Sequence, residues 1–597
     1  MSSPKESFEI RINDFQLVEK ELKKKTNNWT LIRGAAFLFV AISTYLAIKL
    51  YGNGIAILTF VISFGFFLFT VSNHLKLVLE LRKAQLLVKI NKGELNRLDN
   101  NFAGIENGLN YAIQNHNYAS DLDLFGSQSV FQLLNRSHTY AGGQLLADWL
   151  NNPAPKTEII ERQKALIELI KKIEFRQNFE VVAMLSDKVT NPTSDLLNWI
   201  QQPHNETIKK RLFNYGKQLP FLTLAVLVGA ILGFYTYYFV GLLLLIQGII
   251  LKLIDKKAGE ALTQTEPAGE TLKPYSELMQ LIENEQFACK KLQELSSKIG
   301  KASKSVANLG KIIHQLSYRS NPIAALGSII FMLDLRNFIN LENWKAENKN
   351  NLANWLEAVS EFEALNSLSG YQFANPEYAI PQIADETITL NTNGLGHPMI
   401  NKKSRVYNDF SINGSYKSII LTGSNMSGKS TFERTVGLNI VLALMGAVVC
   451  AKEFEVSEMR LFTSMRTQDS LENDTSSFYA ELKRLELLIN LTNRSETNKP
   501  IFYLLDEVLK GTNSKDRHTG AKALILQLKK RNTAGIISTH DVELGDEFEG
   551  SEFIKNYSFS SEMIDNQLVF DYKLKNGVCH SFNASELMRR IGIEIAT

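Results

Sequence analysis

Long apolar runs, interrupted by short turns, mark two segments of the chain. In the first segment, apolar residues fill 34–50 and 55–72 on either side of the turn Tyr51-Gly52-Asn53-Gly54. In the second, 212–252, two apolar runs meet at the aromatic turn 234–238. Each arm has roughly 15–20 apolar residues, close to the length at which a helix crosses a bilayer. The pattern predicts two transmembrane helical hairpins, at 34–72 and 212–252.

Charged residues gather outside both apolar segments. Neither turn contains lysine or arginine, although Lys49 stands just before the first turn and would extend its ammonium toward the interface. The flanking cations are Lys23, Lys24, Lys25, Arg33, Lys76, Arg82 and Lys83 for the first hairpin, and Lys209, Lys210, Arg211, Lys217, Lys252, Lys256 and Lys257 for the second. This bias predicts that all flanks lie in the cytoplasm. Two buried helical hairpins in a large soluble core are the alternative.

The remaining sequence has a helical part and a part in which strands and helices alternate. Helical spacing of apolar residues predicts an amphipathic connector at 73–120, after a cytoplasmic segment at 1–33, and all-α core regions at 121–211 and 275–385. Small polar residues with Pro and Gly predict a linker at 253–274. From 386 to 597, short β-branched runs alternate with helices, which is typical of an α/β domain.

Composition adds few constraints. The chain has 597 residues, enough for several domains, and its formal net charge of +3 neither indicates nor excludes a nucleic-acid partner. The three cysteines, Cys289, Cys450 and Cys579, have no paired spacing, which favours a reducing compartment and no zinc site. The first 25 residues are polar and charged, unlike a cleavable signal peptide.

A glycine-rich loop carries the clearest chemistry. The stretch KSIILTGSNMSGKSTFERTVG places an apolar strand before Gly-x4-Gly-Lys-Ser and an apolar helix after it. In such a loop, backbone N–H groups and the helix N-terminus bind phosphate. Lys429 is expected to reach the β- and γ-phosphates of ATP, and Ser430 to coordinate Mg²⁺. The predicted nucleotide-binding residues are Gly423, Ser424, Asn425, Met426, Ser427, Gly428, Lys429, Ser430, Thr431 and Asp506.

Two later strand ends complete the expected ATPase site. The apolar strand in KPIFYLLDEVLKGTNSKD ends at Asp506, which is placed to bind Mg²⁺, and Glu507 is placed to orient or deprotonate the attacking water. The strand in TAGIISTHD ends at His540, a candidate sensor of the γ-phosphate. The phosphate loop, the Asp506-Glu507 pair and His540 occur in the order that an ATPase site requires. This order favours a functional site over three unrelated sets of polar residues at strand ends.

These motifs resemble those of the MutS family of DNA mismatch repair ATPases. The resemblance rests on TGSNMSGKST, LLDEVLKGTNSKD and STHD, and it implies an ABC-type ATPase domain that works as a homodimer. The segment FTSMRTQDSLENDTSSFYAELKRL resembles the part of the family that carries a serine to the partner's γ-phosphate, and Ser476 matches that serine. Asp474 and Thr475 depart from the usual Gly-Arg at this point, and an aspartate near a γ-phosphate is repulsive unless it faces elsewhere.

The resemblance continues upstream, with one large difference. Residues 121–200 and 275–385 are similar to the helical core, or lever, of the family. The family's mismatch-reading domain would precede this core, yet the residues before Asp121 supply a hairpin and a charged helix without the expected Phe-x-Glu. The second hairpin interrupts the lever where a DNA clamp is expected. The resemblance therefore implies a membrane-anchored variant without direct mismatch recognition.

The sequence supports one principal function and two alternatives. The principal expectation is a membrane-anchored ATPase that uses ATP and Mg²⁺, acts as a dimer, and is coupled to DNA or a DNA-associated partner in repair or recombination. Its expected location is the bacterial inner membrane, with the ATPase domain and both termini in the cytoplasm. The alternatives are an ATP-gated membrane scaffold without a DNA role and an ABC transporter. The transporter lacks support because no Leu-Ser-Gly-Gly-Gln signature is present.

Overall fold

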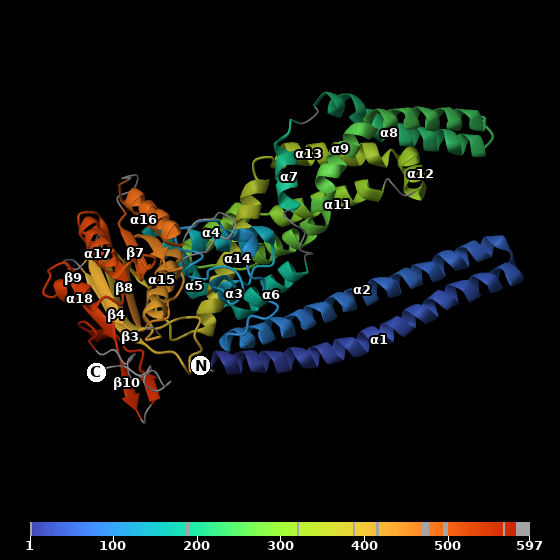
Figure 1. The fold of residues 1–597 in the computed structure, drawn as a ribbon. Helices are drawn as coiled ribbons and strands as arrows, with labels where there is room; N and C mark the ends of the chain where they lie inside the picture. Colours follow the sequence, from blue (N-terminus) through green and yellow to red (C-terminus); the bar gives the residue numbers. More distant parts are fainter. Residues whose placement is uncertain are drawn as a thin grey trace. The chain divides into compact units, whose positions relative to one another are not determined.

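The computed structural model describes residues 3–185, 192–203, 206–318, 322–385, 388–413, 417–424, 426–466, 477–493, 499–564 and 567–580. Within them the chain forms two compact units. The first comprises residues 1–101 and 173–187, and the second comprises 102–172 and 188–597. Each unit is described by itself below, and Figure 1 gives the element labels.

The first unit is built on a pair of very long helices. Helices α1 (Pro4–Tyr51) and α2 (Asn53–Leu98) are joined at Gly52 and run antiparallel beside each other (Figure 1). Ser3 and Glu6 form a capping box that satisfies free N–H groups at the start of α1. Helix α6 (Ile173–Met184) packs against the far end of α2, where Leu86, Leu87, Ile90 and Val181 form a small core.

Small residues line the contact between α1 and α2 in their apolar part. Ala36, Val40 and Ala47 of α1 are buried, as are Ala56, Ser63 and Thr70 of α2. The hydroxyl groups of Ser63 and Thr70 donate to carbonyl groups of their own helix at 2.7 Å. Large apolar side chains point outward instead, and Leu58 and Ile62 are 60% and 66% exposed. Close contact through small residues, with the hydroxyl groups of Ser63 and Thr70 satisfied within the helix, suits packing in lipid.

Helices α1 and α2 are both long and apolar enough to cross a membrane by length and composition. That criterion alone is weak evidence, because core helices of soluble proteins also meet it. The second expected hairpin lies in α8 (Glu206–Ile231) and α9 (Tyr237–Asn284). The apolar part of α8 is Gln218–Ile231 and that of α9 is Tyr237–Lys252, and each has between 10 and 17 residues. At 1.5 Å per residue they extend about 20–25 Å, less than the hydrocarbon thickness of a bilayer.

The second unit contains the helical core. Besides α8 and α9, its helices are η1 (Leu109–Tyr111), α3 (Val130–Leu134), α4 (Tyr140–Asn151), α5 (Lys156–Leu169), α7 (Pro192–Gln201), α10 (Lys290–Ile299), α11 (Ala302–Ser317), α12 (Pro322–Phe331), α13 (Leu333–Asn348) and α14 (Leu352–Ala374). Helix α14 is buried along most of its length and packs against α4, α5 and α10. Between α8 and α9, buried Gln247 donates to Thr223 Oγ1 at 2.7 Å.

Two stretches differ from the sequence predictions. The linker predicted at 253–274 is wrong, because α9 continues through it to Asn284. Leu272 and Tyr275 are buried, Leu272 against α11, and a Cβ atom at Gly269 would lie 2.9 Å from Ile313 Cγ2. The small residues therefore serve close helix packing, which outweighs the cost of proline in the helix. The amphipathic helix predicted to reach 120 ends at Leu98, and mostly irregular chain follows.

The C-terminal part of the second unit is an α/β domain. Its main sheet has the order β12-β9-β4-β8-β7-β6, and all neighbours except β12 pair in parallel. The strands are β4 (Ser418–Gly423), β6 (Arg460–Ser464), β7 (Ile501–Asp506), β8 (Thr533–Thr539), β9 (Ile554–Phe559) and β12 (Lys575–Asn576). Helices α15 (Lys429–Met445), α16 (Ser477–Asn493), α17 (Ser514–Lys529) and α18 (Val542–Glu547) follow individual strands.

A smaller sheet and a β-hairpin complete this domain. The smaller sheet has the order β1-β5-β2-β3, formed by β1 (Gln382–Ala384), β2 (Thr389–Leu395), β3 (Asn408–Asn413) and β5 (Glu453–Ser457). Strands β10 (Ser561–Ile564) and β11 (Gln567–Phe570) pair antiparallel. In the main sheet, β4, β8 and β7 are adjacent and parallel, so their carboxyl ends meet at one edge. Ligands in open α/β sheets bind at such an edge.

Candidate nucleotide-binding site

The loop after β4 has the backbone geometry of a phosphate-binding turn. Gly423 and Gly428 have φ values of 151° and 107°. A Cβ atom at Gly423 would lie 2.7 Å from the carbonyl oxygen of Phe559, so this position requires glycine. Gly428 precedes the first residue of α15, and the N–H groups at the start of that helix are therefore available to an anion.

Some polar groups in the phosphate loop have no hydrogen-bond partner among the described residues. Lys429 is buried, and its Nζ donates to the carbonyl oxygens of Gly423 and Ser424 at 2.8 and 3.1 Å. Burial lowers the pKa of Lys429, while the carboxylates of Glu507, Asp506 and Glu433 oppose that shift. The hydroxyl oxygens of Ser424 and Ser427 are buried and have no hydrogen-bond partner among the described residues. Orphaned hydroxyls beside a buried lysine fit a phosphate group.

The predicted catalytic side chains meet at the ends of β7 and β8. His540 Nε2 lies 2.6 Å from Glu507 Oε1, and His540 Nδ1 lies 2.9 Å from the carbonyl oxygen of Gly423. Because both ring nitrogens face acceptors, His540 donates to both only as an imidazolium. Lys510 Nζ lies 3.3 Å from Glu507 Oε2. The bond to His540, followed by the charges of His540 and Lys510, lowers the pKa of Glu507 to about 2.

The backbone around Glu507 is strained. Glu507 has a φ of 53° and Leu509 a φ of 62°, in the left-handed region that such residues rarely adopt. The turn is held from two sides, because Glu507 N–H donates to Ser538 O at 3.1 Å and Leu509 N–H donates to Glu481 Oε1 of α16. Strained residues that the surrounding structure holds in place are concentrated at functional sites.

Asp506 lies at the end of β7, next to β8. Ser538 Oγ donates to Asp506 Oδ1 at 2.5 Å, which orients the carboxylate. Ser430 lies in the first turn of α15, directly after Lys429. A hydroxyl and a carboxylate supply the oxygen ligands that Mg²⁺ prefers, and their placement after β4 and β7 fits such an ion. Asn425 and Ser476 lie outside the described residues.

A cavity of about 370 Å³ extends from the loop toward the smaller sheet. Its lining includes Ser424, Met426, Gly428, Lys429, Ser430, Thr431 and Glu507 from the predicted site, and His397, Ile400, Asn408, Phe559 and Tyr572, which the sequence analysis did not select. The second group comes from three separate segments, so no local motif marks it. Its aromatic and aliphatic side chains form a wall suited to a flat ring next to the phosphate loop.

His397 is one of the residues that line the cavity. Its Nδ1 accepts from the N–H of Met399 at 3.2 Å, so the proton of the neutral ring is on Nε2. Burial, together with the positive charges of Arg405 and Arg434, lowers the pKa of His397 to about 4. The ring is therefore neutral at physiological pH and offers one N–H donor.

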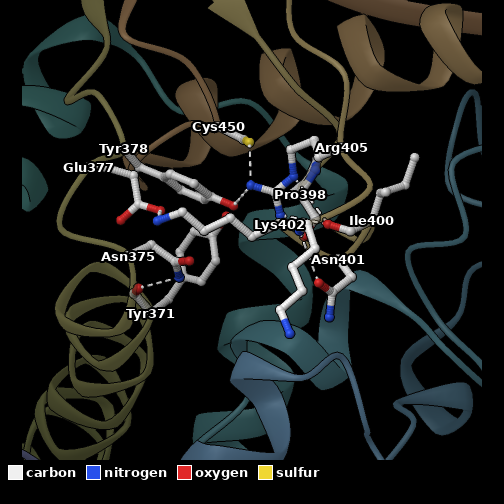
Figure 2. Close-up of polar contacts among 11 residues, drawn as sticks. Tyr371, Asn375, Glu377, Tyr378, Pro398, Ile400, Asn401, Lys402, Arg405 and Cys450 are labelled. Carbon is white, nitrogen blue, oxygen red and sulfur yellow. Dashed lines mark hydrogen bonds and ion pairs between the residues drawn. The ribbon is translucent and has the colours of Figure 1, made fainter. Parts of the chain in front are cut away.

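Arg405 holds the loop that carries Pro398 and Ile400, directly after His397 in the sequence (Figure 2). Its guanidinium donates to the carbonyl oxygens of Pro398 and Ile400 at 3.3 and 2.7 Å. It also donates to Tyr378 Oη at 2.7 Å and to Cys450 Sγ at 3.1 Å. Tyr378 follows the last helix of the core, α14, so this one side chain ties the cavity wall to the core.

The far end of α15 also contacts the core. Arg162 of α5 donates to the carbonyl oxygen of Met445 at 2.9 Å, and Ala154 N–H donates to that of Leu444 at 2.9 Å. These donors satisfy carbonyl groups at the C-terminus of the helix whose N-terminus follows the phosphate loop. Helix α15 therefore links the cavity directly to α5.

Comparison with known proteins shows which family the C-terminal α/β domain resembles. Residues 419–592 match the family described as MutS domain V. The C-terminal α/β domain is therefore of the MutS domain V type. The DNA mismatch repair protein MutS of Thermotoga maritima is 29% identical over 243 residues, which are 40% of this chain and 29% of that protein. The MutS proteins of Fervidobacterium nodosum and Clostridium novyi are 28% and 31% identical over 326 and 252 residues.

The MutS-family match is confined to part of each relative. The alignments with the Fervidobacterium and Clostridium proteins cover 35% and 27% of those proteins, and 54% and 40% of this chain. The matched domain contains the phosphate-loop helix, Asp506, Glu507 and His540. Helices α1 and α2 lie outside it.

Proposed function

We propose that this chain is a membrane-anchored, MutS-type ATPase. In this proposal, the loop 423–431 binds the phosphates of ATP, Ser430 and Asp506 hold Mg²⁺, and the aromatic wall of the cavity receives the base. The observation that carries the proposal is that Lys429 and Glu507 line one cavity of about 370 Å³, with His540 in contact with Glu507 at 2.6 Å. Mg²⁺ supplies positive charge that neutralises the phosphate oxygens.

Glu507 and His540 have complementary roles in this proposal. With His540 and Lys510 on its two oxygens, Glu507 is ionised and its carboxylate accepts a hydrogen bond from an attacking water. His540 lies between Glu507 and Gly423, within reach of both the water-orienting group and the phosphate loop. An N–H group of its ring can donate a hydrogen bond at the place where negative charge develops during phosphoryl transfer.

The proposed assembly is a homodimer in which Ser476 of each chain completes the site of the other. This part rests on the MutS-family domain and the resemblance of the segment around Ser476. Closure of the dimer on ATP would move the helical core. Two contacts join the core to the cavity and would transmit this movement: the contact between α15 and Arg162, and the loop held by Arg405. The output of this movement is proposed to be DNA or a DNA-associated partner, because the matched relatives are DNA mismatch repair proteins. Direct mismatch reading is not part of the proposal.

We expect DNA to change the ATPase rate of the purified dimer in detergent. Turnover would be measured at low salt, because phosphate contacts weaken steeply as salt rises. Homoduplex, mismatched and branched DNA would be compared with a buffer control. A rise in kcat or a fall in KM with any of them supports coupling to DNA. ATP hydrolysis that no DNA alters, together with no DNA binding, would favour the alternative of an ATP-gated membrane scaffold.

Membrane anchoring is proposed through α1 and α2, with the shorter α8–α9 pair also in contact with lipid. We expect the protein to remain in the membrane pellet after an alkaline carbonate wash. Replacing exposed Leu58 and Ile62 with lysine should increase the released fraction, because a lysine near the bilayer centre, as at Ile62, costs about 2.5–3.5 kcal/mol. The matched control carries lysine at Ile10 and Leu17, exposed positions outside the apolar part of α1. Release of the whole wild-type protein would contradict anchoring.

A further inference from the structure

One buried carboxylate next to the candidate site has no role in the mechanism above. Glu433 lies on α15, four residues beyond Lys429 and three beyond Ser430, so all three share one face of the helix. Its side chain is 0% exposed. Neither carboxylate oxygen has a hydrogen-bond partner among the described residues, although the backbone N–H of Ser538 is near enough to favour the ionised form.

The charged groups near Glu433 are those of the proposed Mg²⁺–ATP site. They are Asp506 at the end of β7, Lys429 in the phosphate loop, and Lys510 beyond Glu507. Burial, followed by the negative charge of Asp506, raises the pKa of Glu433. An unpartnered carboxyl group in a packed interior is costly compared with an apolar side chain of similar size. A cation near Asp506 would offset this cost.

We propose that Glu433 is a positioning residue that makes nucleotide binding depend on Mg²⁺. The inference rests on the proposed function, because it assumes that Ser430 and Asp506 hold Mg²⁺ and that Lys429 contacts phosphate. A divalent cation near Asp506 favours the ionised form of Glu433, and the charge of that carboxylate in turn adds to the attraction for the cation. Glu433 therefore favours Mg²⁺–ATP over free ATP, without contacting the nucleotide.

Equilibrium binding separates this role from a purely structural one. The full chain in detergent would be titrated with a fluorescent ATP analogue, once with excess Mg²⁺ and once with EDTA, and the ratio of the two Kd values compared between variants. We expect Glu433→Gln to reduce the preference for the Mg²⁺-bound nucleotide about tenfold, which corresponds to one weakened charge interaction. The Mg²⁺ concentration at half-maximal binding should rise as well. Glu433→Asp, which keeps the charge, should preserve most of the preference.

Controls distinguish the possible causes of a change. Glu549→Gln removes the same charge from an exposed position of the same domain and should leave the preference at the wild-type value. The Tm of Glu433→Gln without ligand should equal or exceed that of the wild type, because the substitution removes a buried carboxyl group that has no hydrogen-bond partner among the described residues. If Glu433→Gln does not fold, Glu433→Leu provides an apolar replacement for the same titration, with the same expected loss.

The outcomes identify which proposal fails. An unchanged Kd ratio in Glu433→Gln or Glu433→Leu, with intact binding of Mg²⁺–ATP, would overturn the role of Glu433 and leave the proposed function standing. A lowered Tm with an unchanged ratio would assign Glu433 to stability alone, and would likewise overturn the inference. Absence of nucleotide binding by the wild-type protein, with Mg²⁺ and with EDTA, would instead contradict the proposed function.

Discussion

Replacement of Glu507 by glutamine is expected to lower kcat for ATP hydrolysis by about 10²–10⁴-fold, the usual range for a carboxylate that orients or deprotonates the attacking water. Glutamine has the shape of glutamate but accepts a proton poorly and carries no charge. It cannot form the ion pairs of Glu507 with His540 and Lys510, at 2.6 and 3.3 Å. ATP binding should persist, because Glu507 does not belong to the phosphate loop, and the ATP-bound dimer should accumulate.

This prediction would be checked by single-turnover hydrolysis beside equilibrium ATP binding. Glu543→Gln is the matched control, because Glu543 is an exposed carboxylate on α18 of the same domain. It should turn over ATP at the wild-type rate. Unchanged turnover in Glu507→Gln would show that another group positions the water.

The ion pair with His540 also sets the expected pH dependence. The pKa of Glu507 is lowered from 4.5 to about 2, so its ionised form contributes to stability above pH 4.5. That contribution is lost as pH falls from about 4.5 toward 2. No inflection in the ATPase rate above pH 5 should therefore come from Glu507. In His540→Ala the largest cause of the shift is removed, and the pKa of Glu507 should return toward its ordinary value.

Replacement of Lys429 by alanine is expected to weaken ATP binding by about 100-fold. Charge-assisted hydrogen bonds contribute about 1.5–3 kcal/mol each, and 1.4 kcal/mol is tenfold in Kd. In the structure, the ammonium group is buried in the loop and donates only to carbonyl oxygens of the loop, among its described partners. A phosphate group would provide a charged acceptor in place of these neutral ones.

The measurement is titration of the detergent-solubilised protein with labelled ATP. Lys452→Ala serves as the control, since Lys452 is an exposed lysine of the same domain. Its Kd should match that of the wild type. Wild-type affinity in Lys429→Ala would refute the assignment of the phosphate loop.

Local motifs predicted the phosphate-loop and catalytic residues of the candidate site. Long-range packing explains the other residues that line the cavity. The glycine spacing around Lys429 and the strand ends at Asp506 and His540 are encoded in short stretches, and parallel strand order brings them together. His397 and Tyr572 lie in segments far from the loop in sequence, and they line the same cavity only after the smaller sheet and the C-terminal segment pack. No spacing rule connects such residues.

The misread helix α9 has a related cause. Pro267 and Gly269 are ordinary signals for a linker, and the sequence alone contains no information on what packs beside them. In the structure, Gly269 allows the close approach of Ile313, and the buried neighbours Leu272 and Tyr275 stabilise the helix through tertiary contacts. The sequence shows the apolar pattern of α8 and α9. The length of their apolar helical parts, however, follows only from where each helix begins and ends in the structure.

The most direct test of the central claim is equilibrium binding of ATP to the purified full-length protein in the presence of Mg²⁺, with stoichiometry measured by isothermal titration calorimetry. The structure predicts one nucleotide per chain, bound at the loop 423–431, with binding lost or greatly weakened in Lys429→Ala. The absence of saturable binding by the folded wild-type protein, or equal binding by Lys429→Ala, would contradict the account.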